Sequence, residues 1–203
     1  MSVHSPPPLI LASGSPTRAT MLRNAGVAFE VRTAPVDEAA LRDGLLAEGT
    51  SPRDVADALA EMKAQRVSAK HPGAAVIGSD QILSLDGRVF AKADTRDEAL
   101  DKLRTLRGHR HSLFSAAVIC EDGRPTWRHV SEVRMLMRDV SDAYLDAYLD
   151  RNWPEVAGAV GAYHVEGEGV RLFTQINGDY FTILGLPLLP LLAHLTIRGW
   201  IEG

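Results

Sequence analysis

The chain alternates between short apolar runs, typical of buried strands, and longer segments in which apolar residues recur every three or four positions, typical of helices. Apolar runs predict strands at 9–13 and 74–79, and alternating segments predict longer strands at 110–121 and 127–138. The same pattern predicts helices, which are 16–25, 40–48, 51–71, 95–108 and 141–152. Strands that alternate with helices early and pair as hairpins later predict an α/β fold with a mixed, largely extended sheet flanked by helices.

Cap and turn residues support several of these boundaries. Ser15 is a good N-cap, Pro16 suits the first helical position, and Gly26 is typical of a helix end. Asp86-Gly87 between two apolar segments predicts a tight hairpin turn. These residue types stand where the apolar pattern changes period, so pattern and local chemistry agree.

Length and the two ends of the chain bear on its organisation. The 203 residues suit one domain of ordinary size, or two closely apposed lobes. We expect residues 1–8 to form a flexible tail and 9–203 to form a single domain. The most apolar segment, 183–195, contains two prolines and is too short to cross a bilayer, so it predicts a C-terminal helix that faces the core.

Composition and charge narrow the class of protein. A net charge of −4 argues against a general nucleic-acid or anionic-membrane surface. A single cysteine, Cys120, excludes an intrachain disulfide and fits a reducing compartment, so we expect a cytoplasmic protein. Because the net charge is negative, any anion site in this chain must be a local group of positively charged residues. The sequence leaves the oligomeric state open, with a homodimer as one option.

The junction between the first strand and the first helix is the clearest candidate anion site. Ser13, Ser15 and Arg18 surround the start of a helix, where free backbone N–H groups and the helix dipole favour negative charge. The segment lacks the Walker pattern of P-loop proteins. An ordinary strand–turn–helix with a well-chosen cap is the alternative on local pattern alone.

Carboxylates and lysines elsewhere suggest catalytic chemistry. Asp80 follows an apolar run, which places it at the carboxyl end of a buried strand, where ligands of α/β sheets bind. A carboxylate there can ligate Mg²⁺ or accept a proton from water, although a cap or turn aspartate is the alternative. Glu38 lies before a helix, where acids are often dipole partners. Lys63 and Lys92 flank apolar residues, but each also suits a solvated position.

Taken in order, these pieces resemble the Maf family of nucleoside triphosphate pyrophosphatases over nearly the whole chain. The matching motifs share their order with the family, and they are Leu11-Ala12-Ser13-Gly14-Ser15-Pro16-Thr17-Arg18, Val36-Asp37-Glu38, Lys63-Ala64, Gly78-Ser79-Asp80-Gln81-Ile82, Ala91-Lys92-Ala93 and Leu184-Gly185-Leu186-Pro187-Leu188. Alanines flank Lys92 where the family usually has glycine and proline. The resemblance implies a Maf/ITPase-like fold with a cleft between two lobes.

The resemblance also implies an activity: hydrolysis of a nucleotide between its α and β phosphates with a divalent metal, Mg²⁺ or Mn²⁺. In the family the aspartate that matches Asp80 is taken as the proton acceptor. Glu38 and Asp80 are then the expected metal ligands. Lys63 and Lys92, assigned to catalysis, would grip the triphosphate together with Arg18, Ser13 and Ser15 at the helix N-terminus.

Three further positions resemble one subgroup of the family. Thr17, Gln81 and Glu166 stand where the subgroup acting on dTTP and UTP has arginine, threonine and glutamine. This trio is similar to that of enzymes that hydrolyse 7-methyl-GTP, so we expect these side chains to contact the substrate. A dTTP/UTP pyrophosphatase and a non-catalytic nucleotide-binding regulator of cell division are the alternatives.

Overall fold

The computed structural model describes residues 6–203, so most of the expected N-terminal tail lies outside the described residues. One sheet holds seven strands in the order β2-β1-β3-β5-β6-β7, and β4 pairs with β3. The strands are β1 (Leu9–Ala12), β2 (Glu30–Val31), β3 (Ala75–Leu85), β4 (Arg88–Phe90), β5 (Arg110–Glu121), β6 (Arg124–Met137) and β7 (Phe173–Asn177).

The sheet is mixed, as the sequence predicts. β1 pairs in parallel with both β2 and β3, whereas β4 pairs antiparallel with β3 and β7 pairs antiparallel with β6. The turn between β3 and β4 is Asp86-Gly87, whose φ angles of 51° and 83° are those of a tight hairpin turn. The mixed α/β fold is therefore confirmed.

Helices connect these strands close to the predicted positions. The helices are α1 (Pro16–Asn24), α2 (Glu38–Ala47), α3 (Pro52–Ser68), α4 (Arg96–Leu106), α5 (Asp142–Asn152), α6 (Tyr180–Ile183) and α7 (Leu188–Ile197), with two 3₁₀ turns, η1 (Glu155–Gly158) and η2 (Glu168–Leu172). Ser15, Ser51 and Thr95 each cap the helix that follows through a side-chain oxygen. In the part of the chain that is described, no helix is long and apolar enough to cross a membrane.

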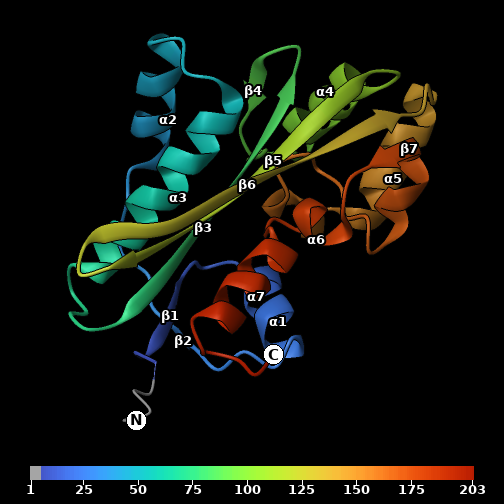
Figure 1. Ribbon diagram of the computed structural model, residues 1–203. Coiled ribbons are helices and arrows are strands. Elements are labelled where there is room, and N and C mark those ends of the chain that lie inside the picture. The colour runs from blue at the N-terminus through green and yellow to red at the C-terminus, as the bar shows by residue number, and fades with distance from the viewer. Residues whose placement is uncertain (1–5) are drawn as a thin grey trace. The chain divides into compact units, whose positions relative to one another are not determined.

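The chain divides into two compact units. The first unit takes its described residues from 6–81, 115–131 and 180–203, and it contains α1, α2, α3, α6 and α7 (Figure 1). The second takes 82–114 and 132–179, with α4, α5 and β7. Strands β3, β5 and β6 contribute residues to both.

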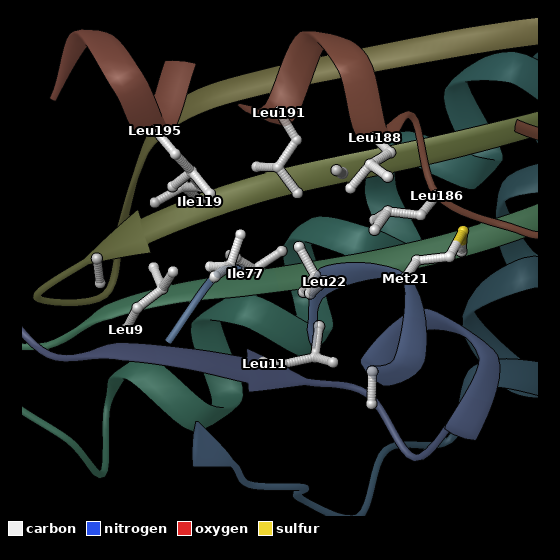
Figure 2. Packing of buried hydrophobic residues seen from close by; sticks show 14 residues of the cluster. Leu9, Leu11, Met21, Leu22, Ile77, Ile119, Leu186, Leu188, Leu191 and Leu195 are labelled. Atoms are coloured by element: carbon white, nitrogen blue, oxygen red, sulfur yellow. The ribbon is translucent and has the colours of Figure 1, made fainter. Parts of the chain in front are cut away.

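The core of the first unit lies between β1, β3 and β5 on one side and α1 and α7 on the other. Figure 2 shows leucines of α7 directed toward Ile77 of β3 and Ile119 of β5, with Met21 and Leu22 of α1 beside them. The leucines concerned, Leu188, Leu191 and Leu195, are buried, as are the strand and α1 residues that they face. Since α1 begins directly after β1, this packing fixes where the N-terminus of α1 lies.

The closing apolar segment differs from the single helix that its hydropathy predicts. It forms the short α6, a turn, and then α7. Gly185 has a φ of 96°, which a helix cannot contain, and Pro187 stands at the N-cap of α7. The predicted core-facing helix is thus confirmed only from Leu188 onward, and the turn before it becomes part of the candidate site.

Candidate active site

The strand–turn–helix at the start of the chain folds as its cap residues predict. The Ser15 hydroxyl accepts a hydrogen bond from the backbone N–H of Arg18 at 3.4 Å, and the Ser13 hydroxyl accepts one from the N–H of Ser15 at 3.3 Å. Thr17 lies half-buried in the first turn of α1. The two serines therefore stabilise the turn between β1 and α1, and the positive end of the α1 helix dipole lies at this turn.

The Arg18 guanidinium holds three parts of the first unit together. Its Nη1 donates to the Ser13 hydroxyl at 3.1 Å and to the Ser79 carbonyl at 3.0 Å, and its Nε donates to the Gly185 carbonyl at 2.7 Å. Burial lowers the pKa of Arg18, while the negative charges of Asp80 and Glu38 oppose that shift. Arginine stays protonated in proteins, so a fixed positive charge lies beside Asp80.

Close packing of α3 on β3 brings Lys63 to Asp80. A Cβ added at Gly78 would lie 2.1 Å from the Ala60 carbonyl oxygen and 2.7 Å from the Ala64 backbone nitrogen, both in α3. Only glycine allows the helix backbone to approach the strand so closely. This approach explains why the Lys63 side chain, on the same helix, reaches the carboxylate two residues further along β3.

Lys63 lies between two carboxylates. Its Nζ is 2.6 Å from Oδ1 of Asp80 and 2.9 Å from Oε2 of Glu38. The side chains of Asp80 and Lys63 are only 9% and 12% exposed, whereas that of Glu38 is 50% exposed. Burial raises the pKa of Asp80, Lys63 and Arg18 act to lower it, and Glu38 adds to the increase. The cluster thus joins a buried, basic carboxylate to two cations.

The position of Asp80 differs in one respect from the prediction. β3 does not end there but continues to Leu85, so Asp80 lies inside the strand. The neighbouring strand β1 ends at Ala12, whose partner in β3 is Gly78. The parallel pairing of β1 with β3 therefore ends just before Asp80, because β1 ends there while β3 continues.

The two predicted metal ligands lie close enough to share one cation. The carboxylates of Glu38 and Asp80 converge on a single cation, the Lys63 ammonium. Mg²⁺ in enzymes is commonly held by one or two carboxylates together with substrate phosphates, and these residues suit that arrangement. Among residues 6–203 no three His, Cys, Asp or Glu side chains are grouped to hold a metal, so the described residues do not form a closed structural metal site.

The side-chain amide of Gln81 contacts the segment before α7. Its Nε2 lies 3.0 Å from the Ser115 hydroxyl, 3.0 Å from the Thr182 carbonyl and 2.9 Å from the Ile183 carbonyl. Both amide hydrogens are therefore engaged by the protein itself.

Lys92 and Glu166 belong to the second unit. Lys92 is exposed directly after β4, and Glu166 is exposed in the turn before η2. In the segment that contains Lys92, the buried Lys102 ammonium donates to the Ala91 carbonyl at 2.5 Å. The convergence of Lys92 and Glu166 with Asp80 stays a prediction.

Sequence reasoning missed the functional neighbours of Arg18 and Gln81. The Gly185 and Ser79 carbonyls accept from Arg18, and the Ser115 hydroxyl and Thr182 carbonyl accept from Gln81. The motif that contains Gly185 resembles the family motif, but its sequence alone indicates no role. The glycine and proline that interrupt a strongly apolar segment were the available sign of a turn with a specific task.

Comparison with known proteins gives matches over almost the full length. The family model for Maf-like protein matches residues 8–197. A nucleoside triphosphate pyrophosphatase of Roseobacter denitrificans is 58% identical over 194 residues, covering 96% of this chain and 98% of that protein. A 7-methyl-GTP pyrophosphatase of Rhizobium meliloti is 51% identical, covering 97% and 99%, and one of Brucella abortus is 48% identical, covering 96% and 98%.

Proposed function

The chain belongs to the Maf family, and from that premise we propose that it is a nucleoside triphosphate pyrophosphatase. Water attacks at the anhydride between the α and β phosphates, that P–O bond breaks, and the products are a nucleoside monophosphate and pyrophosphate. The names of the Roseobacter and Rhizobium relatives support this reaction class.

One observation carries the proposal: the buried Asp80 carboxylate contacts the Lys63 ammonium at 2.6 Å, and Glu38 lies on the other side of that ammonium. Such a cluster supplies a proton acceptor and positive charge in one place, which phosphoryl chemistry requires. Asp80 holds the attacking water and accepts its proton, and burial favours this role because it makes the carboxylate more basic. A divalent cation, Mg²⁺ or Mn²⁺, would be held by Glu38 and Asp80 and would neutralise charge on the triphosphate.

The triphosphate is bound by positive groups around this cluster. The N-terminus of α1 offers backbone N–H groups and the dipole. Lys63 contributes its charge. The Nε and Nη1 of Arg18 already donate to protein oxygens. Arg18 therefore fixes the geometry of the turn in addition to contributing positive charge.

We propose 7-methyl-GTP as the preferred substrate. An ionised Glu166 accepts hydrogen bonds from N1–H and the exocyclic amine of guanine, and the N7-methylated ring is cationic, which favours a carboxylate partner. Thr17 is shorter than arginine and leaves space for a purine. The names of the Rhizobium and Brucella relatives support this choice. A charge-assisted hydrogen bond contributes about 1.5–3 kcal/mol, which corresponds to roughly a tenfold to hundredfold preference.

The test is pyrophosphate release from 7-methyl-GTP, GTP, dTTP and UTP, each with Mg²⁺ and with Mn²⁺. We expect pyrophosphate and the monophosphate, with 7-methyl-GTP turned over fastest. GTP is the matched control, since it differs from 7-methyl-GTP only in the methyl group and its charge. Preference for dTTP or UTP contradicts the substrate assignment alone. Release of orthophosphate, or binding of all four nucleotides without turnover, contradicts the reaction and favours a nucleotide-binding regulator.

A further inference from the structure

Residues 79–81 of β3 direct their side chains to two different faces of the strand. Successive side chains of a strand point to opposite faces. Asp80 faces α3 and contacts Lys63, whereas the hydroxyl of Ser79 and the amide of Gln81 both reach the segment before α7. Gln81 therefore points away from the face on which the Asp80 carboxylate lies.

The Gln81 amide anchors the turn between α6 and α7. The Thr182 carbonyl accepts hydrogen bonds from Gln81 Nε2 at 3.0 Å, from the Ser115 hydroxyl at 2.8 Å and from the backbone N–H of Gly185 at 3.1 Å. The same Nε2 also reaches the Ile183 carbonyl at 2.9 Å. Thr182 and Ser115 are fully buried, so these bonds are shielded from competing water.

The other end of this turn holds Arg18. The Gly185 carbonyl accepts hydrogen bonds from Arg18 Nε at 2.7 Å and from the Ser79 hydroxyl at 3.1 Å. Gly185 has a φ of 96°, and a Cβ added there would lie 3.3–3.4 Å from the guanidinium nitrogens. The place of the guanidinium is thus set by the conformation of a turn that Gln81 fixes three residues earlier.

We propose that Gln81 is a positioning residue: through the turn 182–185 it fixes the Arg18 guanidinium beside the phosphate-binding start of α1, and it does not contact the nucleobase. This inference rests on the proposed function. A substitution of Gln81 is then expected to change the affinity for the triphosphate, which all substrates share. A residue that contacts the base would instead change the preference among nucleotides.

The test compares Gln81→Met, which keeps the length of the side chain and removes its donors, with the wild type. Inorganic tripolyphosphate, which has no base, is the probe, and its affinity in the presence of Mg²⁺ is measured by calorimetry. We expect about a tenfold loss of tripolyphosphate affinity and the same rise in KM for 7-methyl-GTP and for dTTP, since one hydrogen-bonded contact is weakened. Gln175→Met is the matched control, because Gln175 is exposed in the second unit.

Two results overturn the inference. One is an unchanged tripolyphosphate affinity together with a tenfold change in the kcat/KM ratio of 7-methyl-GTP to dTTP, which would place Gln81 on the base. The other is a lower melting temperature with no change in affinity or ratio, which would make its role structural only. Wild-type protein that does not bind tripolyphosphate overturns the inference as well.

A second variant covers the case in which Gln81→Met does not fold. Ser115→Ala removes one donor to the Thr182 carbonyl and leaves the others, so we expect a smaller loss of tripolyphosphate affinity and faster hydrogen exchange at the Gly185 N–H. No change in either quantity would overturn the inference. Since tripolyphosphate binding needs no turnover, a wild type that binds it but hydrolyses no nucleotide refutes the proposed function, while the comparison of variants still decides the inference.

Discussion

Each unit of the molecule buries ionisable side chains, but with opposite chemical results. In the first unit, Asp80 is buried against Lys63 at 2.6 Å and beside Arg18. In the second, the His111 imidazole is buried with its Nε2 2.8 Å from the Tyr163 hydroxyl. The first cluster contains charges of both signs, and the second contains none.

The surroundings of His111 are aromatic. Its ring centroid lies 5.9 Å from that of Tyr163 and 5.9 Å from that of Phe173. Burial alone lowers the pKa of His111 to about 4, and burial raises the pKa of Tyr163. Both groups are therefore neutral at ordinary pH.

The difference shows what burial does to a titratable group. Where a counter-charge is buried too, as for Asp80, the desolvation of the carboxylate is partly offset and the group remains available for proton transfer. Where no counter-charge is present, as for His111, the group gives up its charge and serves as packing. Three variants test this contrast, beginning with the largest expected effect.

Asp80→Asn keeps the shape of the side chain and removes both its charge and its basicity. We expect the rate of pyrophosphate release to fall by about 10²–10⁴, the usual effect of losing a general base. Asp139→Asn is the control, since the Asp139 side chain is 91% exposed. A folded Asp80→Asn enzyme that retains most of its turnover would remove Asp80 from the chemistry.

Lys63→Met breaks the charged cluster and leaves Asp80 buried without its nearest counter-charge. Removing one partner of a buried pair costs about 3–5 kcal/mol. The pKa of Asp80, already raised in the folded protein, rises further. The unfolded carboxyl ionises near pH 4, so the loss of stability is expected to grow as pH rises from 4 to 7.

Denaturant unfolding of Lys63→Met at several pH values measures this effect. Lys70→Met is the matched control, since Lys70 is exposed just beyond the end of α3. Equal destabilisation at pH 4 and pH 7 would contradict the electrostatic account of the cluster.

His111 gives the smallest and most specific effect. Its folded pKa of about 4 lies below the ordinary value of 6.5, so between these values the unfolded chain binds a proton that the folded protein does not. Stability is therefore full above pH 6.5 and falls as pH drops toward 4, by on the order of 3 kcal/mol. His111→Phe should flatten this part of the pH dependence, whereas His109→Phe, at an exposed histidine, should leave it unchanged. An unaltered slope in His111→Phe would assign the pH dependence to other groups.

Much of the local structure is determined by the sequence alone. Ser15 and Pro16 begin α1 where the pattern places them, and Asp86-Gly87 makes the hairpin turn. Lys63 and Asp80, which residue type and the family resemblance single out separately, lie in direct contact. Caps, turns and apolar periodicity act over a few residues, so they can be read directly from the chain.

Only the tertiary structure decides which partners the site residues take. Arg18 and Gly185 are 167 positions apart, and their hydrogen bond exists because α1 and α7 pack against one core. Gln81 lies next to Asp80 in sequence, yet strand alternation sends the two side chains to opposite faces, where α3 meets one and the turn before α7 meets the other. No local pattern specifies these contacts, because they depend on which distant segments the packing of the core brings to each face of β3.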